Sequence, residues 1–267
     1  MDDSLRRTRA RTFSGVADVY ARTRPGYPER AVSWLVPKPG SRVLELGAGT
    51  GKLTASLCEQ GHDVVAADTS MPMLDRLASS LDVPTVQAAA ELLPFRANSF
   101  DVVVAAQAFH WFDAERALPE IARVLRDGDE LALVWNMRDE SIPWARKLTE
   151  IIGSEGDDFG WLYDGPLPAS PLFGPIERED FGFWQPLDVD ALQGLVRSRS
   201  YVAALPEADR QRVLDRVREL YASYERGPDG LRLRYITACF RTRVDKTALP
   251  ADRIEPPGGG DLLFDFH

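Results

Sequence analysis

The stretch VLELGAGTGKLT, residues 43–54, decides the fold of this chain. An apolar run ends at Leu46, and three glycines at positions 47, 49 and 51 follow it before a segment with helical spacing begins at Lys52. Glycine permits tight turns and lets a ligand approach the backbone closely. A strand, a glycine-rich turn and a helix in this order are typical of the ligand-binding end of an open α/β sheet.

Short apolar runs recur on both sides of helical segments in the residues that follow. They are VLEL (43–46), VVAA (64–67), PTVQ (84–87), VVVAA (102–106) and LALVW (131–135). The first three start about twenty residues apart, which suits parallel crossovers. The runs are continuous rather than alternating, as in strands covered on both faces. We therefore predict a doubly wound, Rossmann-like α/β fold.

Two familiar phosphate-binding motifs do not fit the glycine loop. The Walker loop needs G-x-x-x-x-G-K-[ST], but Leu53 follows Lys52 here and Leu46 stands at the position of the first glycine. The dinucleotide fingerprint G-x-G-x-x-G fails because Lys52 takes the place of its third glycine. The pattern that remains is [DE]-x-G-x-G-x-G, with Glu45 as the acid.

Residues 45–51 resemble motif I of the class I S-adenosylmethionine-dependent methyltransferases. Residues 88–113 are similar to the stretch G-x-A-E-x-L-P-F-x-x-x-S-F-D of the small-molecule branch called methyltransferase type 11, with Ala88 in place of the usual glycine. Residues 20–28 also look like the Y-x-x-x-R-P-x-Y-P lead-in of this branch. The resemblance implies a seven-stranded sheet, in which residues 231–244 form the antiparallel strand beside residues 177–188.

An acid at the end of the second strand fits a ribose-binding role. Asp68 lies 21 residues after Gly47 (68 − 47), the spacing of a ribose-binding acid. The alternative is that Asp68 caps the following helix, although Ser70 is also available for that. By the resemblance, Asp68 binds the ribose of the cofactor, and the residues that bind S-adenosylmethionine are Tyr20, Arg24, Glu45, Gly47, Ala48, Gly49, Thr50, Gly51, Asp68, Thr69, Ser70, Met73, Ala89, Ala90, Glu91 and Gln107.

The segment after the fourth strand is where we expect the methyl acceptor. His110 is the candidate general base, and a structural hydrogen bond is the alternative. Trp111 is a candidate substrate contact, with packing as its alternative. Arginine side chains pair with carboxylates; Arg138 is the substrate candidate of this type, and the wider set is Arg22, Arg24, Arg138, Arg197 and Arg199.

The chain divides into six segments by composition and by the resemblance. We predict a mobile tail at 1–12, a helical cap at 13–40, the cofactor-binding core at 41–140, a helical substrate-pocket insertion at 141–230 with a core strand at about 177–188, a core strand at 231–254, and a linker and tail at 255–267. Within them, Asp127-Gly128 is expected to form a turn. Residues 153–175, rich in Gly, Pro and Asp, are expected to form a loop or lid.

Composition and charge narrow the classes of function. The chain has 267 residues with 32 Lys and Arg against 41 Asp and Glu, a net charge of −9, which disfavours nucleic acid as a partner. We find no signal peptide, no membrane span and no metal-ligand spacing. Two cysteines favour a reducing compartment. We expect a cytoplasmic monomer or homodimer without a metal.

These expectations combine into one function. We predict an S-adenosylmethionine-dependent methyltransferase that transfers a methyl group to a small molecule by SN2 displacement, chiefly through proximity and orientation. The alternative is a non-catalytic module that binds the same cofactor as a sensor or partner subunit. A nicotinamide-dependent oxidoreductase is disfavoured by Lys52. A nucleic-acid methyltransferase is disfavoured because residues 106–109 read AQAF instead of N-P-P-[YF].

Overall fold

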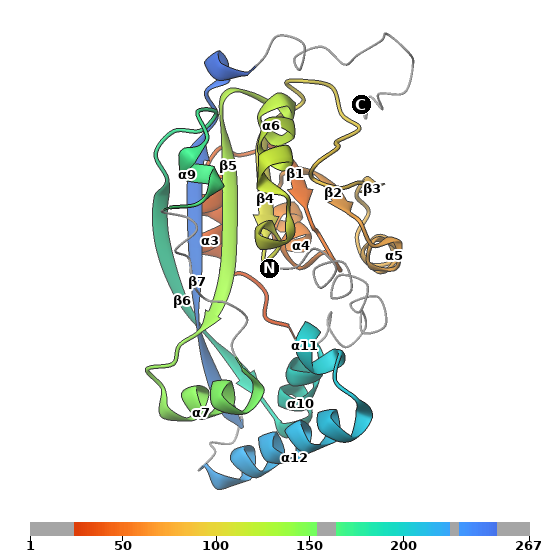
Figure 1. The fold of residues 1–267 in the computed structure, drawn as a ribbon, viewed down its shortest axis with the longest axis vertical. Helices are drawn as coiled ribbons and strands as arrows, with labels where there is room; N and C mark the ends of the chain where they lie inside the picture. The colour runs from red at the N-terminus through yellow and green to blue at the C-terminus, as the bar shows by residue number, and fades with distance from the viewer. Residues whose placement is uncertain (1–23, 154–163, 225–229, 250–267) are drawn as a thin grey trace. The chain divides into compact units, whose positions relative to one another are not determined.

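Seven strands form a single sheet within residues 24–153, 164–224 and 230–249, the parts of the chain that the computed structural model describes. Their order is β3-β2-β1-β4-β5-β7-β6 (Figure 1). The pairs β1–β2, β2–β3, β1–β4 and β4–β5 are parallel. The strands are β1 (Arg42–Leu46), β2 (Asp63–Asp68), β3 (Thr85–Gln87), β4 (Phe100–Ala106), β5 (Leu125–Arg138), β6 (Glu177–Leu187) and β7 (Leu231–Arg243).

Helices connect most of these strands. They are α3 (Glu29–Leu35), α4 (Lys52–Glu59), α5 (Met71–Ala78), α6 (Ala114–Val124), α7 (Pro143–Ile152), α9 (Pro166–Ala169), α10 (Val189–Arg197), α11 (Ser200–Ala203) and α12 (Glu207–Ser223), with 3-10 turns η2 (Phe109–Trp111) and η3 (Lys246–Ala248). Helix α4 ends at Glu59, and Gly61 follows its last turn at φ 79°, a conformation that favours glycine after the end of a helix. None of the helices in the described part of the chain is long and apolar enough to cross a membrane.

The chain groups into two compact units. The sheet-core unit comprises Glu29–Trp135, Asp158–Asp180 and Ala238–His267, and the helical unit comprises Met1–Pro28, Asn136–Asp157 and Phe181–Thr237. Three of the five borders between them fall inside β5, β6 and β7. Each unit is therefore assembled from three separate stretches of chain.

The sheet-core unit is built on β1 and β4, whose middle residues are fully buried. Leu44 and Val103 pair across the two strands and expose no surface. Branched and apolar side chains on both faces explain why these runs form central parallel strands. Helices α4 and α5 pack against β2. Because β1 and β2 are parallel, the loops that follow them lie at the same edge of the sheet.

The helical unit has its own apolar core. Helix α12 packs against α7 and α10, and Figure 1 shows these three helices together. Their contact residues include Leu148, Leu192, Leu195, Val217 and Leu220. Between two other segments of this unit, the Asn136 side chain donates to the Gly26 carbonyl at 2.9 Å and accepts from the Thr237 hydroxyl at 2.7 Å.

The prediction of seven strands is confirmed, including the strands near 177–188 and 231–244. The turn expected at Asp127-Gly128 is wrong, because β5 runs through it. The register of the β4–β5 pair shifts between Phe100 and Val102. Residues 126–129 form the irregular part of β5 that this shift requires, and Gly128 within them has φ 77°. The expected loop at 153–175 contains the short helix α9, while residues 154–163 and the predicted tails at 1–12 and 255–267 lie outside the described residues.

Candidate functional site

The glycine loop turns sharply at Gly47, directly after β1. The N–H groups of Gly47 and Ala48 both donate to the carbonyl of Ala67 at the end of β2, at 2.8 and 3.0 Å. Gly47 has φ 70°, and a Cβ added to it would lie 2.5 Å from the Cβ of Ala108. Only glycine meets both demands at this position, in backbone angle and in space.

The space around the α-carbon of Gly49 is open. This residue has φ 56°, and a Cβ built on it meets nothing within 4 Å. By contrast, a Cβ on Gly51 would lie 2.8 Å from the Leu77 side chain. The hydroxyl of Thr50, between them, is buried and has no hydrogen-bond partner among the described residues. The loop therefore combines an open glycine with a hydroxyl that lacks a partner, which suits a polar ligand.

The carboxylate of Asp68, at the end of β2, binds the glycine loop. Its Oδ2 accepts from the Gly49 N–H and its Oδ1 accepts from the Ser70 N–H, both at 2.8 Å. Burial raises the pKa of Asp68, while hydrogen bonds from the backbone N–H groups of Ser70, Gly49 and Thr69 act to lower it. Since each carboxylate oxygen has two lone pairs, these bonds leave acceptor sites for a pair of ligand hydroxyls. Ser70 occupies the N-cap position of α5 without a side-chain capping bond.

Glu45, the acid of the glycine motif, is buried on β1 and exposes 1% of its surface. The Thr54 hydroxyl donates to its Oε2 at 2.6 Å. Burial raises the pKa of Glu45 to about 8, against the lowering effect of the Thr54 bond and with a further rise from the charge of Asp68. The raised pKa favours the neutral form of Glu45, and its bond with Thr54 links β1 to the first turn of α4 inside the core.

The loop after β3 runs next to Asp68. The Ala88 N–H donates to the Asp68 carbonyl at 3.1 Å, Ala89 is half-buried and Ala90 is buried. The Glu91 carboxylate accepts from the backbone N–H of Asp113 at 2.7 Å, which anchors the start of α6. Two further candidates lie on or before α5: Thr69 is exposed, and Met73 is buried with 4% of its surface exposed.

Gln107 lies immediately after β4 in a left-handed conformation, with φ 55°. Its N–H donates to the Val134 carbonyl of β5 at 2.8 Å. A residue with a side chain rarely adopts positive φ, and such strain clusters at functional positions. The role predicted for Gln107 stays a prediction, and its backbone angle is the feature that singles it out at the end of β4.

His110 lies in η2 and takes part in a hydrogen bond through its ring. The Trp135 Nε1–H donates to His110 Nδ1 at 3.4 Å, and the Trp111 ring lies 4.7 Å from the imidazole, centroid to centroid. An accepting Nδ1 means that the neutral ring carries its proton on Nε2. This bond is of the structural kind that was weighed as the alternative for His110, and the role of general base stays a prediction.

The arginine candidates belong to the helical unit and differ in how deeply they are buried. Arg24 donates to the hydroxyl and the carbonyl of Ser198, and Arg138 donates to the Thr149 hydroxyl. Arg199 is buried, whereas Arg197 is exposed. Tyr20 and Arg22 lie outside the described residues.

The sequence analysis does not single out Trp135, whose indole donates to His110, or Tyr235, which is buried in β7. The available signal for Tyr235 is the alternation of β7, which places it on the same face as Leu233 and Thr237, both of them buried.

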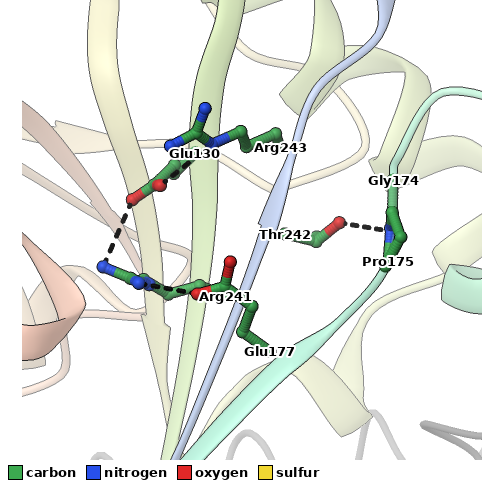
Figure 2. Close-up of a pocket in the computed structure, with 7 residues that line it drawn as sticks. All are labelled: Glu130, Gly174, Pro175, Glu177, Arg241, Thr242 and Arg243. Carbon is green, nitrogen blue, oxygen red and sulfur yellow. Dashed lines mark hydrogen bonds and ion pairs between the residues drawn. The ribbon is translucent and has the colours of Figure 1, made fainter.

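A small cavity of about 160 Å³ lies elsewhere in the sheet-core unit. Figure 2 shows its charged residues in pairs: Glu130 faces Arg241 and Arg243, and Arg241 also binds Glu177 at 2.7 Å. None of the predicted site residues lines it. Because its charges compensate one another and its volume is below the range of about 300–1,000 Å³ for ligand pockets, it is not the cofactor site.

Comparison with known proteins identifies the family. A model of the methyltransferase domain matches residues 44–133. An uncharacterized methyltransferase of Mycobacterium tuberculosis is 45% identical over 90% of this chain and 98% of its own length. A methyltransferase-like protein of Schizosaccharomyces pombe is 34% identical over 88% of this chain and 96% of its own length.

Solved structures agree on the fold. A protein from Anaeromyxobacter dehalogenans, assigned provisionally as a type II methyltransferase, is 25% identical with a TM-score of 0.56 over 83% of this chain and 97% of its own. The YcgJ protein of Bacillus subtilis is similar with a TM-score of 0.50 and 18% identity, over 82% and 99% of the two chains. Together with the glycine loop and the acid after β2, these relatives show that the chain belongs to the class I methyltransferases, whose methyl donor is S-adenosylmethionine.

Proposed function

We propose that the protein transfers a methyl group from S-adenosylmethionine to a small-molecule acceptor. The observation that carries the proposal is the contact between the Gly49 N–H and the Asp68 carboxylate, at a loop with open space beside Gly49. The bound cofactor supplies an electrophilic methyl group on a sulfonium, so the protein needs no catalytic nucleophile of its own.

Different residues of the sheet-core unit hold different parts of that cofactor. Asp68 accepts hydrogen bonds from the two ribose hydroxyls, and Thr50 offers a hydroxyl that lacks a partner among the described residues. Gln107, held at positive φ after β4, presents a side-chain amide at the end of that strand. The half-buried or buried Ala89 and Ala90 present small side chains where the flat base is expected.

The chemistry then depends on alignment and exclusion of water. Displacement at a methyl carbon requires the acceptor atom, the carbon and the sulfur in line, and fixed positions supply most of the rate. His110, as an Nε2–H donor, orients an acceptor oxygen or nitrogen, and the proton that an O–H or N–H acceptor loses on methylation is released to solvent with the products.

Calorimetric titration of the full chain with S-adenosylmethionine tests the proposal, with NADH as the control ligand. We expect saturable binding of S-adenosylmethionine alone. The variant Thr50→Val should weaken that binding and leave the melting temperature unchanged, because the lost hydroxyl has no partner among the described residues. Binding of NADH alone, or of neither ligand, contradicts the proposal.

A further inference from the structure

The loop after β3, residues 88–95, is attached to two different parts of the sheet-core unit. At its start, the Ala88 N–H donates to the carbonyl of Asp68 at 3.1 Å, in the residue whose carboxylate binds the glycine loop. Near its end, the Leu93 N–H donates to Oε2 of Glu120, on helix α6, at 2.9 Å. The loop therefore runs from the predicted ribose-binding acid to α6.

A buried ion pair holds the later turns of α6 against this loop. Glu120 and Arg123 are both buried, and Arg123 donates to the two carboxylate oxygens of Glu120, from Nε at 3.0 Å and from Nη2 at 2.8 Å. Arg123 also donates to the carbonyls of Leu93 at 2.8 Å and Phe95 at 2.6 Å. A bidentate pair has a fixed geometry, so the loop and this part of α6 are held together as one piece.

Glu91 makes a separate bond to the start of the same helix. Its Oε1 accepts from the backbone N–H of Asp113 at 2.7 Å. Asp113 is the N-cap of α6, and its own side chain makes no capping hydrogen bond. A carboxylate is a strong acceptor for a backbone N–H, and the dipole of a helix favours an acid at this end. The Glu91 side chain therefore fixes the point at which α6 begins.

The turn η2, with His110 and Trp111, lies between this point and the glycine loop. Ala108, immediately before η2, packs closely on Gly47, because a Cβ added to Gly47 would lie 2.5 Å from the Cβ of Ala108. After η2, the bond to Glu91 holds the N-cap of α6. The segment that bears both rings is thus attached at each end to a loop that we expect to bind the cofactor.

We propose that Glu91 is a positioning residue that couples binding of the cofactor to the placement of η2. A cofactor that orders the loop after β3 also orders η2, because the bond from the Asp113 N–H to Glu91 joins the two segments. This role adds to the cofactor contact that the resemblance implies for Glu91. The coupling to the cofactor rests on the proposed methyl transfer, whereas the attachment of η2 through Glu91 does not.

Variants on both sides of the bond test the proposal. Glu91→Ala removes the acceptor, and Glu91→Gln keeps Oε1 as an acceptor without the charge. Asp113→Pro removes the donor. Its backbone fits proline, since Asp113 has φ −76° and the preceding Phe112 is extended at ψ 148°.

Two further variants are matched controls. Asp113→Ala removes the same side chain as Asp113→Pro but keeps the N–H donor. Glu115→Ala removes an exposed acid from the first turn of α6 and so reproduces the loss of charge in Glu91→Ala.

The measurement is hydrogen exchange at the Trp111 and Phe112 amides, whose N–H groups donate to the carbonyls of Ala108 and Phe109. It is followed by NMR on the full chain, with and without S-adenosylmethionine, and calorimetry gives the affinity. We expect the cofactor to slow exchange at both amides in the parent, in Glu91→Gln and in the two controls.

Glu91→Ala and Asp113→Pro should lose this effect and bind S-adenosylmethionine about fivefold more weakly, the lower end of the usual coupling between two sites. Either variant alone carries the test if the other does not fold. Combined in one chain, the two changes should weaken binding no more than one of them does, since both remove the same bond.

Two results overturn the proposal. One is a cofactor effect on the Trp111 and Phe112 amides that persists in Glu91→Ala and Asp113→Pro. The other is a loss of that effect in Glu91→Gln or Asp113→Ala as large as the loss in Glu91→Ala.

Failure of the proposed function looks different, because the parent then binds no S-adenosylmethionine. Exchange without ligand decides in that case. Faster exchange at the Trp111 and Phe112 amides in Glu91→Ala than in Glu115→Ala supports the attachment of η2 through Glu91, and equal rates overturn it.

Discussion

The carboxylate of Asp68 at the end of β2 accepts a hydrogen bond from the backbone N–H of Gly49, 2.8 Å away in the glycine loop after β1. The bond fixes the loop and the acid relative to each other before any ligand arrives. Such preorganisation lowers the entropic cost of binding, because neither group has to be ordered by the ligand.

Asp68→Ala should weaken binding of S-adenosylmethionine by about 1.5–3 kcal/mol, the value of hydrogen bonds to a charged group. This corresponds to roughly 10- to 150-fold in the dissociation constant. Calorimetric titration measures the change. The matched control is Asp75→Ala, an exposed acid on α5. Equal affinity in Asp68→Ala and the parent removes the ribose-binding role.

Gly47→Ala should lower the stability of the fold. The added methyl group would lie 2.5 Å from the Ala108 Cβ, and φ 70° disfavours any side chain. Backbone strain costs about 1–2 kcal/mol and overpacking about 1–3 kcal/mol more. Denaturant unfolding of Gly40→Ala isolates the strain, because Gly40 has φ 66° and open space around it. Similar losses in the two variants contradict the close approach to Ala108.

Most of the sheet-core unit could be predicted from the sequence because its signals are local. Continuous apolar runs defined β1, β2 and β4, and the glycine spacing placed the loop at the end of β1. The irregularity at Gly128 could not be predicted, since it depends on the register between β4 and β5. The contact between Arg24 and Ser198 could not be predicted either, because the two residues are 174 positions apart and meet only in the folded chain.

Glu45 should make stability fall as pH rises. Its folded pKa of about 8 is above the unfolded value of 4.5, so the folded state binds the extra proton between these two values. Linkage then lowers the free energy of unfolding as pH rises through this window, with a slope approaching about 1.4 kcal/mol per pH unit. Chemical unfolding at a series of pH values measures this slope.

The control for this dependence is Glu45→Gln, which keeps an oxygen acceptor for the Thr54 hydroxyl but cannot ionise. Its unfolding free energy should lose most of the slope between pH 4.5 and about 8, so that it is more stable than the parent at the alkaline end. The same slope in parent and variant would show that Glu45 is ionised in the folded protein.

His110 should be an Nε2–H tautomer in its neutral form, because Nδ1 accepts from the Trp135 indole. The ¹⁵N shifts of the imidazole nitrogens report the tautomer directly. Trp135→Phe removes the donor and should bring the ring toward a mixture of tautomers. An Nδ1–H ring in the parent protein would restore His110 as a candidate general base.

The Asn136 side chain, which joins Gly26 to Thr237, has a consequence for biosynthesis. During synthesis, Thr237 leaves the ribosome long after Gly26 and Asn136, so the link between the three residues is not complete until Thr237 has emerged. Each compact unit includes residues after position 180, so neither can fold completely before those residues are synthesised. The fold therefore depends on contacts between residues far apart in the sequence, which makes a slow, late step in folding the expected consequence.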